Sequence, residues 1–556
     1  MYNFLLMLEK AKAHREGFER VLESHPNVHE NPPRWFLILR ALERREAITL
    51  KTGALATWTP PESTGRSPKD TYFVRDSVSE PKVDWDSPYA NAMDPKTFDV
   101  LWQDALEKLS QKPELFFVER SLNADPRYAF KVRILTDRAL SALFSDNVLR
   151  PVPDEYPESV FYDEPFHLLV LPYDKLDPKK YEGRLRKLPD GRTSNMAVAM
   201  DFERRLGVVY GSAYGGSIKK LLFTVMNYIL PQVDVLPLHC GANDGPDGVA
   251  LFLGLSGTGK TTLSSDPERV FIGDDEHLWS ERGVANMEGG CYAKLINLRP
   301  EKEPEIYNAV FHEDHPLKHG AIVENAMVYP DGSFDLDDDR YTPNSRASYP
   351  LYFLSNIKEP PVGGHPRTIL FLTADANGVL PPVAKLTPSA AMLWFLMGYT
   401  SKLAGTETGI IEPVSTFSRF FGEPFMPLKP DVYARMLKDK MLAHKTNVYL
   451  INTGWTGGPY GVGHRFDINV TRQVVRAAIS GALEGVEYRE DKLFHLLVPT
   501  EAPGVPKEVL WPKNTWPKPE EYDERARKLA RDFAQYFDRV FKGKVPKEVE
   551  EACPGK

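Results

Sequence analysis

The sequence has little cysteine, no excess of positive charge and no long hydrophobic run. Among its 556 residues only Cys240, Cys291 and Cys553 are cysteines, so no disulfide framework is indicated and a reducing compartment is expected. These three cysteines neither require nor exclude one bridge. The formal net charge of −8 argues against a nucleic-acid partner, because phosphate backbones require a positively charged protein face.

The longest apolar stretch, around residues 390–399, is far shorter than a membrane span, which takes about 20 residues. The N-terminal residues mix acidic and basic side chains with apolar ones at roughly helical spacing, and they show no signal or transit peptide. Hydrophobic residues make up 42% of the chain and charged residues 26%, as in ordinary globular proteins. We therefore expect a cytoplasmic protein with no membrane partner.

A glycine-rich loop is the most informative feature present. In "LFLGLSGTGKTTLSSDPERVFIGDDEH", residues 251–277, the residues Gly254, Gly259, Lys260 and Thr261 fit the G-x-x-x-x-G-K-[ST] pattern after a strand-like run. Glycines let backbone N–H groups turn toward phosphate oxygens, Lys260 would contact the β- and γ-phosphates, and Thr261 would ligate Mg²⁺. The alternative is a surface turn with a solvated lysine.

The spacing after this loop is short. Asp274 follows Lys260 by fourteen positions, and Pro267 after "SSD" predicts that the helix beginning at Lys260 ends within about two turns. The next strand, residues 269–273, would then deliver Asp274 and Asp275 beside the phosphate site. This pattern indicates a compact mononucleotide-binding module rather than an enzyme with long crossover helices.

The chain changes character near residue 233. Residues 1–233 mix helical patterns with short strand-like runs and proline-rich loops, and they contain no nucleotide motif. Residues 234–556 are richer in strand-like runs separated by Gly, Pro and Asp, and they contain the phosphate loop. We therefore predict an α/β protein with two domains, of which the second binds a nucleotide.

Other polar residues follow strand-like or glycine-rich segments. His239 ends an apolar run, and with Asp275 it could supply nitrogen and oxygen ligands to a divalent transition metal, although a lone histidine is more often a structural hydrogen-bonding group. In "YGSAYGGSIKK", Tyr214 and two glycines precede Lys219 and Lys220, so the backbone could approach a small ligand. The alternative is a helix N-terminus with two solvated lysines.

Three arginines, Arg66, Arg346 and Arg465, lie among Gly, Pro, Ser or Asn residues. In such loops a guanidinium could be directed at a carboxylate or a phosphate. Taken singly, an arginine of this kind is more often a solvated surface residue than a functional one.

From about Arg66 to Thr471 the chain resembles ATP-dependent phosphoenolpyruvate carboxykinase. The matching stretches, in order, are "TGRSPKD", "YGGSIKK", "FTVMNYILP", "LPLHCGAN", "GLSGTGKTTLS", "FIGDDEH", "EGGCYAKLINL", "EPEIYNAV", "NSRASYP" and "NTGWTGG". The resemblance implies a two-domain α/β fold with a substrate-binding domain, residues 1–233, and a C-terminal P-loop mononucleotide-binding domain, residues 234–556. It places the active site in the cleft between them.

The resemblance also implies an activity. The expected reaction is the ATP-dependent decarboxylation and phosphorylation of oxaloacetate to phosphoenolpyruvate, ADP and CO₂, catalysed by a carboxy-lyase of gluconeogenesis. A metal-stabilised pyruvate enolate would attack the γ-phosphate of ATP, with Mn²⁺ and Mg²⁺ as cofactors. Oxaloacetate and ATP would be the small-molecule partners, and we expect a monomer.

Residue roles carry over from the matching motifs. The substrate would be bound by Arg66, Tyr214, Lys219 and Lys220. Mn²⁺ would be bound by Lys220, His239 and Asp275, and Mg²⁺ by Thr261. ATP would be contacted by Lys220, His239, Gly254, Leu255, Ser256, Gly257, Thr258, Gly259, Lys260, Thr261, Thr262, Glu303, Arg346, Arg465, Phe466 and Thr471. The catalytic residues would be Arg66, Lys220, Lys260, Asp274 and Arg346.

Three other functions stay open at this point: a P-loop kinase for another small acid, the GTP-dependent form of the same reaction, and a non-catalytic nucleotide sensor. "SGTGKTT" favours the ATP class, because the GTP class has a cysteine in its phosphate loop. Arg66, Lys220, His239 and Asp275 together argue against a sensor, which needs neither a substrate site nor a second metal.

Overall fold

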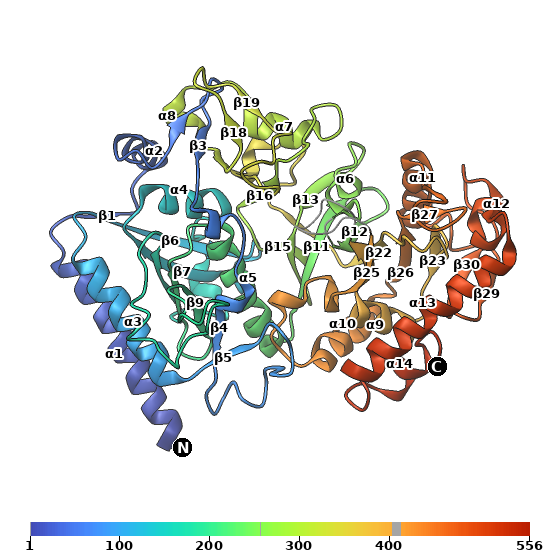
Figure 1. Ribbon diagram of the computed structural model, residues 1–556, viewed down its shortest axis with the longest axis horizontal. Helices are drawn as coiled ribbons and strands as arrows, with labels where there is room; N and C mark the ends of the chain where they lie inside the picture. Colours follow the sequence, from blue (N-terminus) through green and yellow to red (C-terminus); the bar gives the residue numbers. More distant parts are fainter. Residues whose placement is uncertain (1, 256, 403–412) are drawn as a thin grey trace. The chain divides into compact units, whose positions relative to one another are not determined.

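The computed structural model describes residues 2–255, 257–402 and 413–556, and the chain divides into two compact units (Figure 1). Unit 1 consists of Met1–Ile229 and Met287–Ser355, and unit 2 of Leu230–Asn286 and Asn356–Lys556. The segment Met287–Ser355 belongs to unit 1 because its strand β17 (Ile322–Glu324) pairs with β3 (Leu55–Thr57). Both units combine helices with sheets, so the α/β class is confirmed, whereas the functional domains 1–233 and 234–556 stay a prediction.

An eight-stranded sheet forms the centre of unit 1. Its strands, in spatial order, are β1 (Val28–Glu30), β6 (Leu115–Leu122), β7 (Phe130–Thr136), β8 (Phe166–Leu171), β10 (Leu206–Tyr210), β9 (Ala197–Asp201), β4 (Thr71–Val74) and β5 (Asn91–Met93). Every residue of β8, β9 and β10 is buried. This burial explains why these strands read as nearly continuous apolar runs.

Helix α3 (Pro95–Ser110) shows how local sequence sets an element of unit 1. It begins at Pro95 because the Asp94 carboxylate accepts the N–H groups of Lys96 and Thr97, which have no partner within the helix. Its buried side chains recur at helical spacing: Phe98, Leu101, Trp102, Ala105, Leu106 and Leu109. They pack into the core of the sheet, and α1 (Tyr2–Ser24) runs alongside α3 (Figure 1).

A second, five-stranded sheet of unit 1 carries several predicted site residues. Its order is β16 (Gly290–Lys294), β20 (Arg346–Pro350), β17, β3 and β2 (Ile48–Thr49). The register pairs Arg346 with Lys294 on one side and with Glu324 on the other. Directly paired residues project to the same face of a sheet, so these three side chains form one row.

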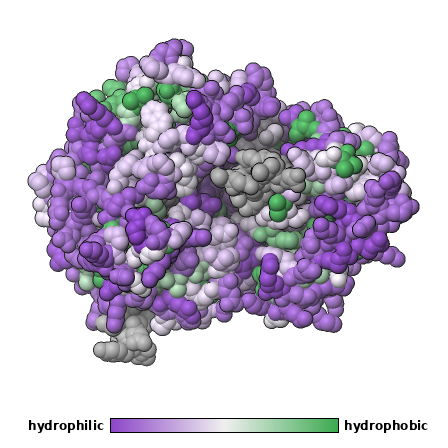
Figure 2. Space-filling model, in the orientation of Figure 1, coloured by the Kyte–Doolittle hydropathy of each residue, from purple (hydrophilic) through white to green (hydrophobic). Residues whose placement is uncertain are grey.

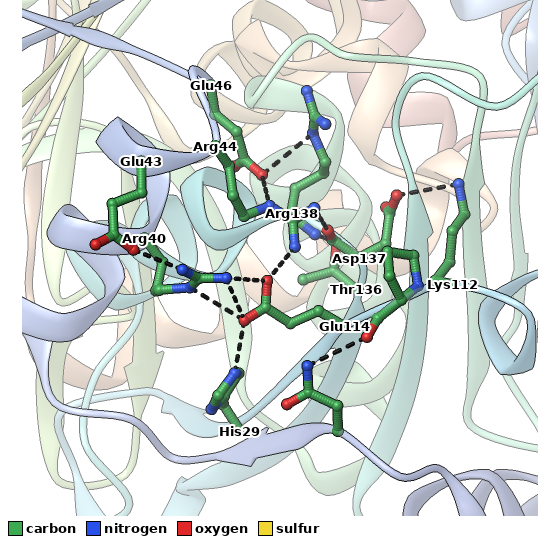
Figure 3. A network of polar contacts seen from close by, with 12 residues as sticks. His29, Arg40, Glu43, Arg44, Glu46, Lys112, Glu114, Thr136, Asp137 and Arg138 are labelled. Atoms are coloured by element: carbon green, nitrogen blue, oxygen red, sulfur yellow. Dashed lines mark hydrogen bonds and ion pairs between the residues drawn. The ribbon is translucent and has the colours of Figure 1, made fainter.

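A polar network stabilises unit 1 around the buried Glu114 (Figure 3). Arg40, Arg44 and His29 all donate to its carboxylate. Burial alone would raise the pKa of Glu114, but these hydrogen bonds outweigh it and lower the pKa to about 2. Arg44 extends the network to Glu46, since the Arg44 Nε atom lies 2.9 Å from the Glu46 Oε1 atom.

The remaining helices of unit 1 are α2 (Arg34–Glu43), α4 (Ala139–Val148), α5 (Gly216–Ile229), α7 (Pro304–Phe311) and α8 (Pro316–His319). A small hairpin joins β18 (Met327–Val328) to β19 (Phe334–Asp335). Among these elements, α5 is buried along most of its length.

Unit 2 is built on an eleven-stranded sheet. Its path is β21 (Val362–Gly363), β15 (Gly283–Asn286), β14 (Glu276–Ser280), β11 (Leu236–Asp244), β12 (Val249–Gly254), β22 (Pro366–Thr373), β26 (Asn447–Asn452), β23 (Val383–Lys385), β30 (Leu496–Pro499) and β29 (Tyr488–Asp491), with β13 (Val270–Gly273) also paired to β11. The central strands β12, β22 and β26 are parallel and buried.

The other elements of unit 2 surround this sheet. They are α6 (Lys260–Ser264), α9 (Pro388–Met397), α10 (Pro430–His444), α11 (Ile468–Ile479), α12 (Lys507–Leu510), α13 (Pro519–Val540), α14 (Lys547–Glu551) and the strand pairs β24 (Tyr399–Lys402) with β25 (Val414–Phe417) and β27 (Trp455–Thr456) with β28 (His464–Arg465).

Most of the longest apolar stretch of the sequence forms α9, a buried core helix that ends at Met397 and is capped by Gly398 in the left-handed conformation. Within the described ranges, none of the helices has the length and apolar character needed to cross a bilayer. On the face drawn in Figure 2, hydrophobic residues appear as small groups between hydrophilic ones. Scattered apolar residues of this kind are ordinary on protein surfaces.

Candidate functional site

The phosphate loop of unit 2 joins β12 to α6. Gly257 and Gly259 have φ values of 85° and 90°, a left-handed conformation that favours glycine. Helix α6 has only five residues and β13 follows at Val270, so the predicted short helix and returning strand are confirmed. Thr258 is buried, whereas Leu255, Thr261 and Thr262 are half-buried, and Ser256 lies outside the described residues.

Strand β11 brings the polar residues of unit 2 to this loop. It pairs antiparallel with β12, β13 and β14, and its register places His239 opposite Glu276, one residue after Asp275. The Asp275 Oδ1 atom lies 2.7 Å from the Lys260 Nζ atom and 3.0 Å from the His239 Nε2 atom. The prediction that an aspartate returns beside the phosphate loop is therefore confirmed for Asp275, and the half-buried Asp274 immediately precedes it.

His239 is oriented by a backbone carbonyl. Its Nδ1 atom lies 2.6 Å from the oxygen of Phe421, and because a carbonyl only accepts, Nδ1 carries the hydrogen and Nε2 faces Asp275. Phe420 and Phe421 both have positive φ values, 61° and 55°, which non-glycine residues rarely adopt and which concentrate at functional sites. A Cβ atom on Gly422 would lie only 3.0 Å from the His239 Cβ atom, so this segment packs closely on the histidine.

The donor set of His239 and Asp275 fits a divalent cation. Histidines that bind metals commonly donate their second ring N–H to a carbonyl or carboxylate, which is the arrangement that Phe421 provides. An imidazole nitrogen and a carboxylate oxygen 3.0 Å apart suit ions such as Mn²⁺. Thr261, the predicted Mg²⁺ ligand, lies in α6 directly after Lys260, whereas Lys220, the third predicted Mn²⁺ ligand, belongs to unit 1.

Arg465 also reaches the phosphate loop. Its Nη2 atom donates to the oxygen of Gly257 at 3.0 Å and its Nε atom to the oxygen of Thr453 at 2.8 Å. The Arg465 side chain is exposed but donates to both carbonyls, and its predicted contact with ATP stays a prediction. Phe466 is buried and donates its N–H to the oxygen of Gly454, and Thr471 is buried on α11.

In unit 1, Tyr214 and the two lysines lie around the start of α5. Tyr214 is buried, and its ring centroid lies 5.6 Å from that of Tyr292. The Lys219 Nζ atom lies 2.7 Å from the Glu288 Oε1 atom, and both side chains are almost completely buried. The alternative of two solvated lysines is thus wrong for Lys219, while Lys220 is half-buried with its Nζ atom 4.9 Å from the Phe223 ring centroid.

Asn344 connects the loop of Arg66 with Arg346. Its Nδ2 atom donates to the oxygen of Thr64, two residues before Arg66, and its Oδ1 atom accepts from Arg346 Nε at 3.0 Å. On the other side of Arg66, the buried Asp70 accepts from the guanidinium of Arg186. The two arginine loops predicted from sequence are therefore neighbours in unit 1.

Sequence reasoning missed several residues that the structure places here. Lys294 pairs with Arg346 across the sheet, and burial together with Arg346 lowers its pKa. Glu288, Lys294 and Asn344 lie within or next to the matching motifs "EGGCYAKLINL" and "NSRASYP", which is the signal that could have found them. Glu303 lies half-buried at the N-terminus of α7 in unit 1.

The three cysteines are all described, buried and not joined to one another. Burial raises the pKa of the Cys240 thiol, which therefore stays protonated beside the phosphate loop strand. The question of a single bridge, open from the sequence, is settled against one.

Comparison with known proteins identifies the family. The model of the phosphoenolpyruvate carboxykinase family matches residues 26–508. "Phosphoenolpyruvate carboxykinase (ATP)" of Thermus thermophilus is 48% identical over 527 residues, which cover 93% of this chain and 95% of the relative. "Phosphoenolpyruvate carboxykinase (ATP) 1" of Moorella thermoacetica is 46% identical over 543 residues, 96% of this chain and 98% of the relative. "Phosphoenolpyruvate carboxykinase (ATP)" of Geobacillus kaustophilus is 46% identical over 521 residues, which cover 93% of this chain and 94% of the relative.

A phosphate loop after a buried strand is typical of nucleotide-dependent enzymes. The chain belongs to the ATP-dependent phosphoenolpyruvate carboxykinase family, whose members are carboxy-lyases. The family resemblance and the enzyme class predicted from the sequence are thereby confirmed.

Proposed function

We propose that the protein converts oxaloacetate and ATP to phosphoenolpyruvate, ADP and CO₂ by means of Mg²⁺ and Mn²⁺. The observation that carries this proposal is the meeting of His239, Asp275 and Lys260 beside the phosphate loop, with His239 Nδ1 committed to the Phe421 carbonyl. A nucleotide sensor would need the loop but not a histidine–carboxylate pair oriented in this way. The relatives, which are named phosphoenolpyruvate carboxykinase (ATP), support the same reaction.

In unit 2, the residues have distinct tasks. The left-handed turn at Gly257 and Gly259 directs backbone N–H groups at phosphate oxygens, and Lys260 neutralises charge on the transferred phosphoryl group. His239 and Asp275 would hold Mn²⁺ and Thr261 would hold Mg²⁺. When bound, these ions supply Lewis-acid stabilisation of developing oxygen charge. Arg465 would hold the phosphate loop next to Thr453 during phosphoryl transfer, because it donates to carbonyl oxygens of both segments.

In unit 1, Arg66, Tyr214, Lys219 and Lys220 would bind oxaloacetate. Loss of CO₂ breaks the carbon–carbon bond and leaves its electron pair in a pyruvate enolate, whose oxygen attacks the γ-phosphorus as ADP departs. Arg346 and its neighbour Lys294 would neutralise anionic oxygens of the reactants.

The remaining predicted residues have supporting tasks. The nucleotide pocket would be lined by Glu303, Phe466 and Thr471. Asp274 would support the metal site.

Further expectations belong to the same proposal: an active site in an interdomain cleft, a cytoplasmic monomer, and a gluconeogenic direction. They follow from the family resemblance rather than from a contact described above.

The proposal is tested by an assay of the purified protein with oxaloacetate, Mg²⁺ and Mn²⁺, in which ADP and phosphoenolpyruvate are measured with ATP or GTP. We expect turnover with ATP alone. Asp275→Asn should abolish it, whereas Asp266→Asn, a matched change in the connection between α6 and β13, should preserve it. Turnover with GTP only would assign the GTP-dependent reaction, and ATP binding without phosphoenolpyruvate would contradict the proposal in favour of a sensor.

A further inference from the structure

A cavity in unit 1 lies next to Tyr214 and the start of α5. Its lining includes Tyr214, Gly215, Glu324, Glu46 and Arg138. Glu324 is only 3% exposed, yet it is a carboxylate on β17 rather than an apolar residue. Burying such a group is unfavourable unless it is hydrogen-bonded, so its partners explain its presence.

Glu324 accepts hydrogen bonds from two parts of the Tyr214 environment. The Tyr292 hydroxyl donates to Glu324 Oε2 at 2.8 Å, and the Gly215 N–H makes a longer, 3.4 Å contact with Oε1. Gly215 follows Tyr214 and precedes α5, the helix that carries Lys219 and Lys220. One carboxylate therefore holds both the backbone of the turn and the neighbouring ring.

Tyr292 and Tyr214 pack against each other and against Gly216. A Cβ atom on Gly216 would lie 2.4 Å from the Tyr214 ring and 3.0 Å from the Tyr292 ring. On its other side, Tyr292 contacts Phe144 edge to face, with ring centroids 5.3 Å apart. Tyr292 is thus held between Phe144 and the Gly216 turn that carries Tyr214, and the only hydrogen-bond donor on the Tyr292 ring is committed to Glu324.

The electrostatic setting agrees with a functional role. Burial raises the pKa of Glu324 to about 7, although the Tyr292 hydroxyl and Arg346 both act to lower it. Arg346 is the cross-strand neighbour of Glu324 and its guanidinium carbon lies 5.8 Å from the Tyr292 ring centroid. Glu324 therefore lies beside Arg346, a predicted catalytic residue, and contacts the turn that follows Tyr214, a predicted substrate-binding residue.

We propose that Glu324 is a positioning residue for the organic acid substrate, which fixes the Tyr214 ring through Tyr292 and the Tyr214–Gly216 turn through Gly215. This inference rests on the proposed function. It adds to that function a residue that acts on substrate binding without contacting the substrate itself. Displacement of a substrate-binding group by about 1 Å can cost as much as a hundredfold in rate.

The test compares Glu324→Ala, Glu324→Gln and Tyr292→Phe with the wild-type enzyme. For Glu324→Ala we expect KM for oxaloacetate to rise about tenfold and KM for ATP to change by less than about twofold, since the change is confined to the turn of unit 1. Tyr292→Phe, which keeps the ring, should show a smaller rise of the same kind. Glu324→Gln should restore most of the affinity, because the amide oxygen still accepts one hydrogen bond.

A second measurement does not depend on turnover. Hydrogen exchange followed by mass spectrometry should show faster exchange of the peptide that contains Gly215 in Glu324→Ala than in the wild type. Glu203→Ala is the matched control, because Glu203 accepts from the Tyr228 hydroxyl at the opposite end of α5. We expect this control to leave KM for oxaloacetate and the exchange of the Gly215 peptide unchanged.

The outcomes separate the two proposals. Absence of wild-type turnover would overturn the proposed function, whatever the variants do. An active wild type with unchanged KM for oxaloacetate in Glu324→Ala, or a rise that Glu203→Ala reproduces, would overturn the role of Glu324 alone. A loss of thermal stability with unchanged KM would show a merely structural glutamate, which also contradicts the inference.

Discussion

The phosphate loop of unit 2 and the Tyr214 turn of unit 1 are both glycine-rich segments ahead of a helix that carries lysine, but their glycines serve different purposes. Gly259 has a φ of 90°, a conformation that favours glycine, although a Cβ atom there would have room, with the Leu263 Cδ1 atom 3.6 Å away. Gly216 lacks a positive φ, and a Cβ atom there would lie 2.4 Å from Tyr214. The phosphate loop therefore needs glycine for its backbone conformation, whereas the Tyr214 turn needs glycine because the Tyr214 ring lies close to the backbone.

The lysines of the two segments differ in the same way. Lys260 pairs with Asp275 where both side chains keep some exposure, 12% and 21%, so a phosphate oxygen can replace the carboxylate. Lys219 and Glu288 are 4% and 2% exposed, and separating them would leave a buried charge without compensation. The comparison indicates that Lys260 can exchange its carboxylate partner for a phosphate oxygen, whereas Lys219 keeps Glu288 and would offer oxaloacetate only its other N–H donors.

The largest effect on activity is expected when the charge of Lys260 is removed. Lys260→Met should lower kcat/KM with ATP by about a thousandfold, because phosphoryl transfer depends mainly on positioning and charge neutralisation. Steady-state kinetics measure this loss, with Lys528→Met on the exposed face of α13 as the control. Activity within about tenfold of the wild type would contradict the role of Lys260.

Next in size is the glycine that provides space. Gly216→Ala should raise KM for oxaloacetate by about tenfold or more while KM for ATP is nearly unchanged, because its Cβ atom would push the Tyr214 ring aside. Gly364→Ala, at a position with open space, serves as the control. Equal changes in both KM values would show that the turn is not specific to the organic acid.

The glycine that provides backbone freedom should give the opposite selectivity. Gly259→Ala forces a residue with a Cβ atom into a left-handed conformation, at a cost of about 1–2 kcal/mol, and we expect KM for ATP to rise about tenfold. KM for oxaloacetate should be nearly unchanged. A larger change for oxaloacetate than for ATP would reverse the comparison drawn above.

The smallest effect concerns pH and stability. Because the folded-state pKa of Glu324 is raised from 4.5 to about 7, the wild type is destabilised progressively as pH rises through this interval. Glu324→Gln has no titrating group at this position and carries no such cost. The Tm of Glu324→Gln minus the Tm of the wild type should therefore increase between pH 4.5 and 7, on the order of 1–2 °C, and then level off. Calorimetry at several pH values measures this, with the exposed Glu268→Gln as control; a difference that falls with pH would contradict it.

The local features of the protein could be predicted from the sequence alone: the phosphate loop after β12, a helix of at most about two turns where α6 lies, the return of Asp275, and the resemblance to the family. These features follow from residue types at short spacings, where glycine, proline and alternating apolar residues restrict the backbone directly. The docked C-terminal helix α13 was predictable for the same reason, since Tyr522, Leu529 and Phe533 recur at helical spacing.

The distant groups that complete the sites could not be predicted from the sequence and are seen only in the folded chain. The Phe421 carbonyl that orients His239 is 182 residues away from it in sequence, and the contact of Glu324 with Gly215 spans 109 residues. The inclusion of Met287–Ser355 in unit 1 likewise depends on the pairing of β17 with β3. Buried polar groups obtain their partners only when the chain is folded, and no local pattern records which carbonyl or carboxylate that partner will be.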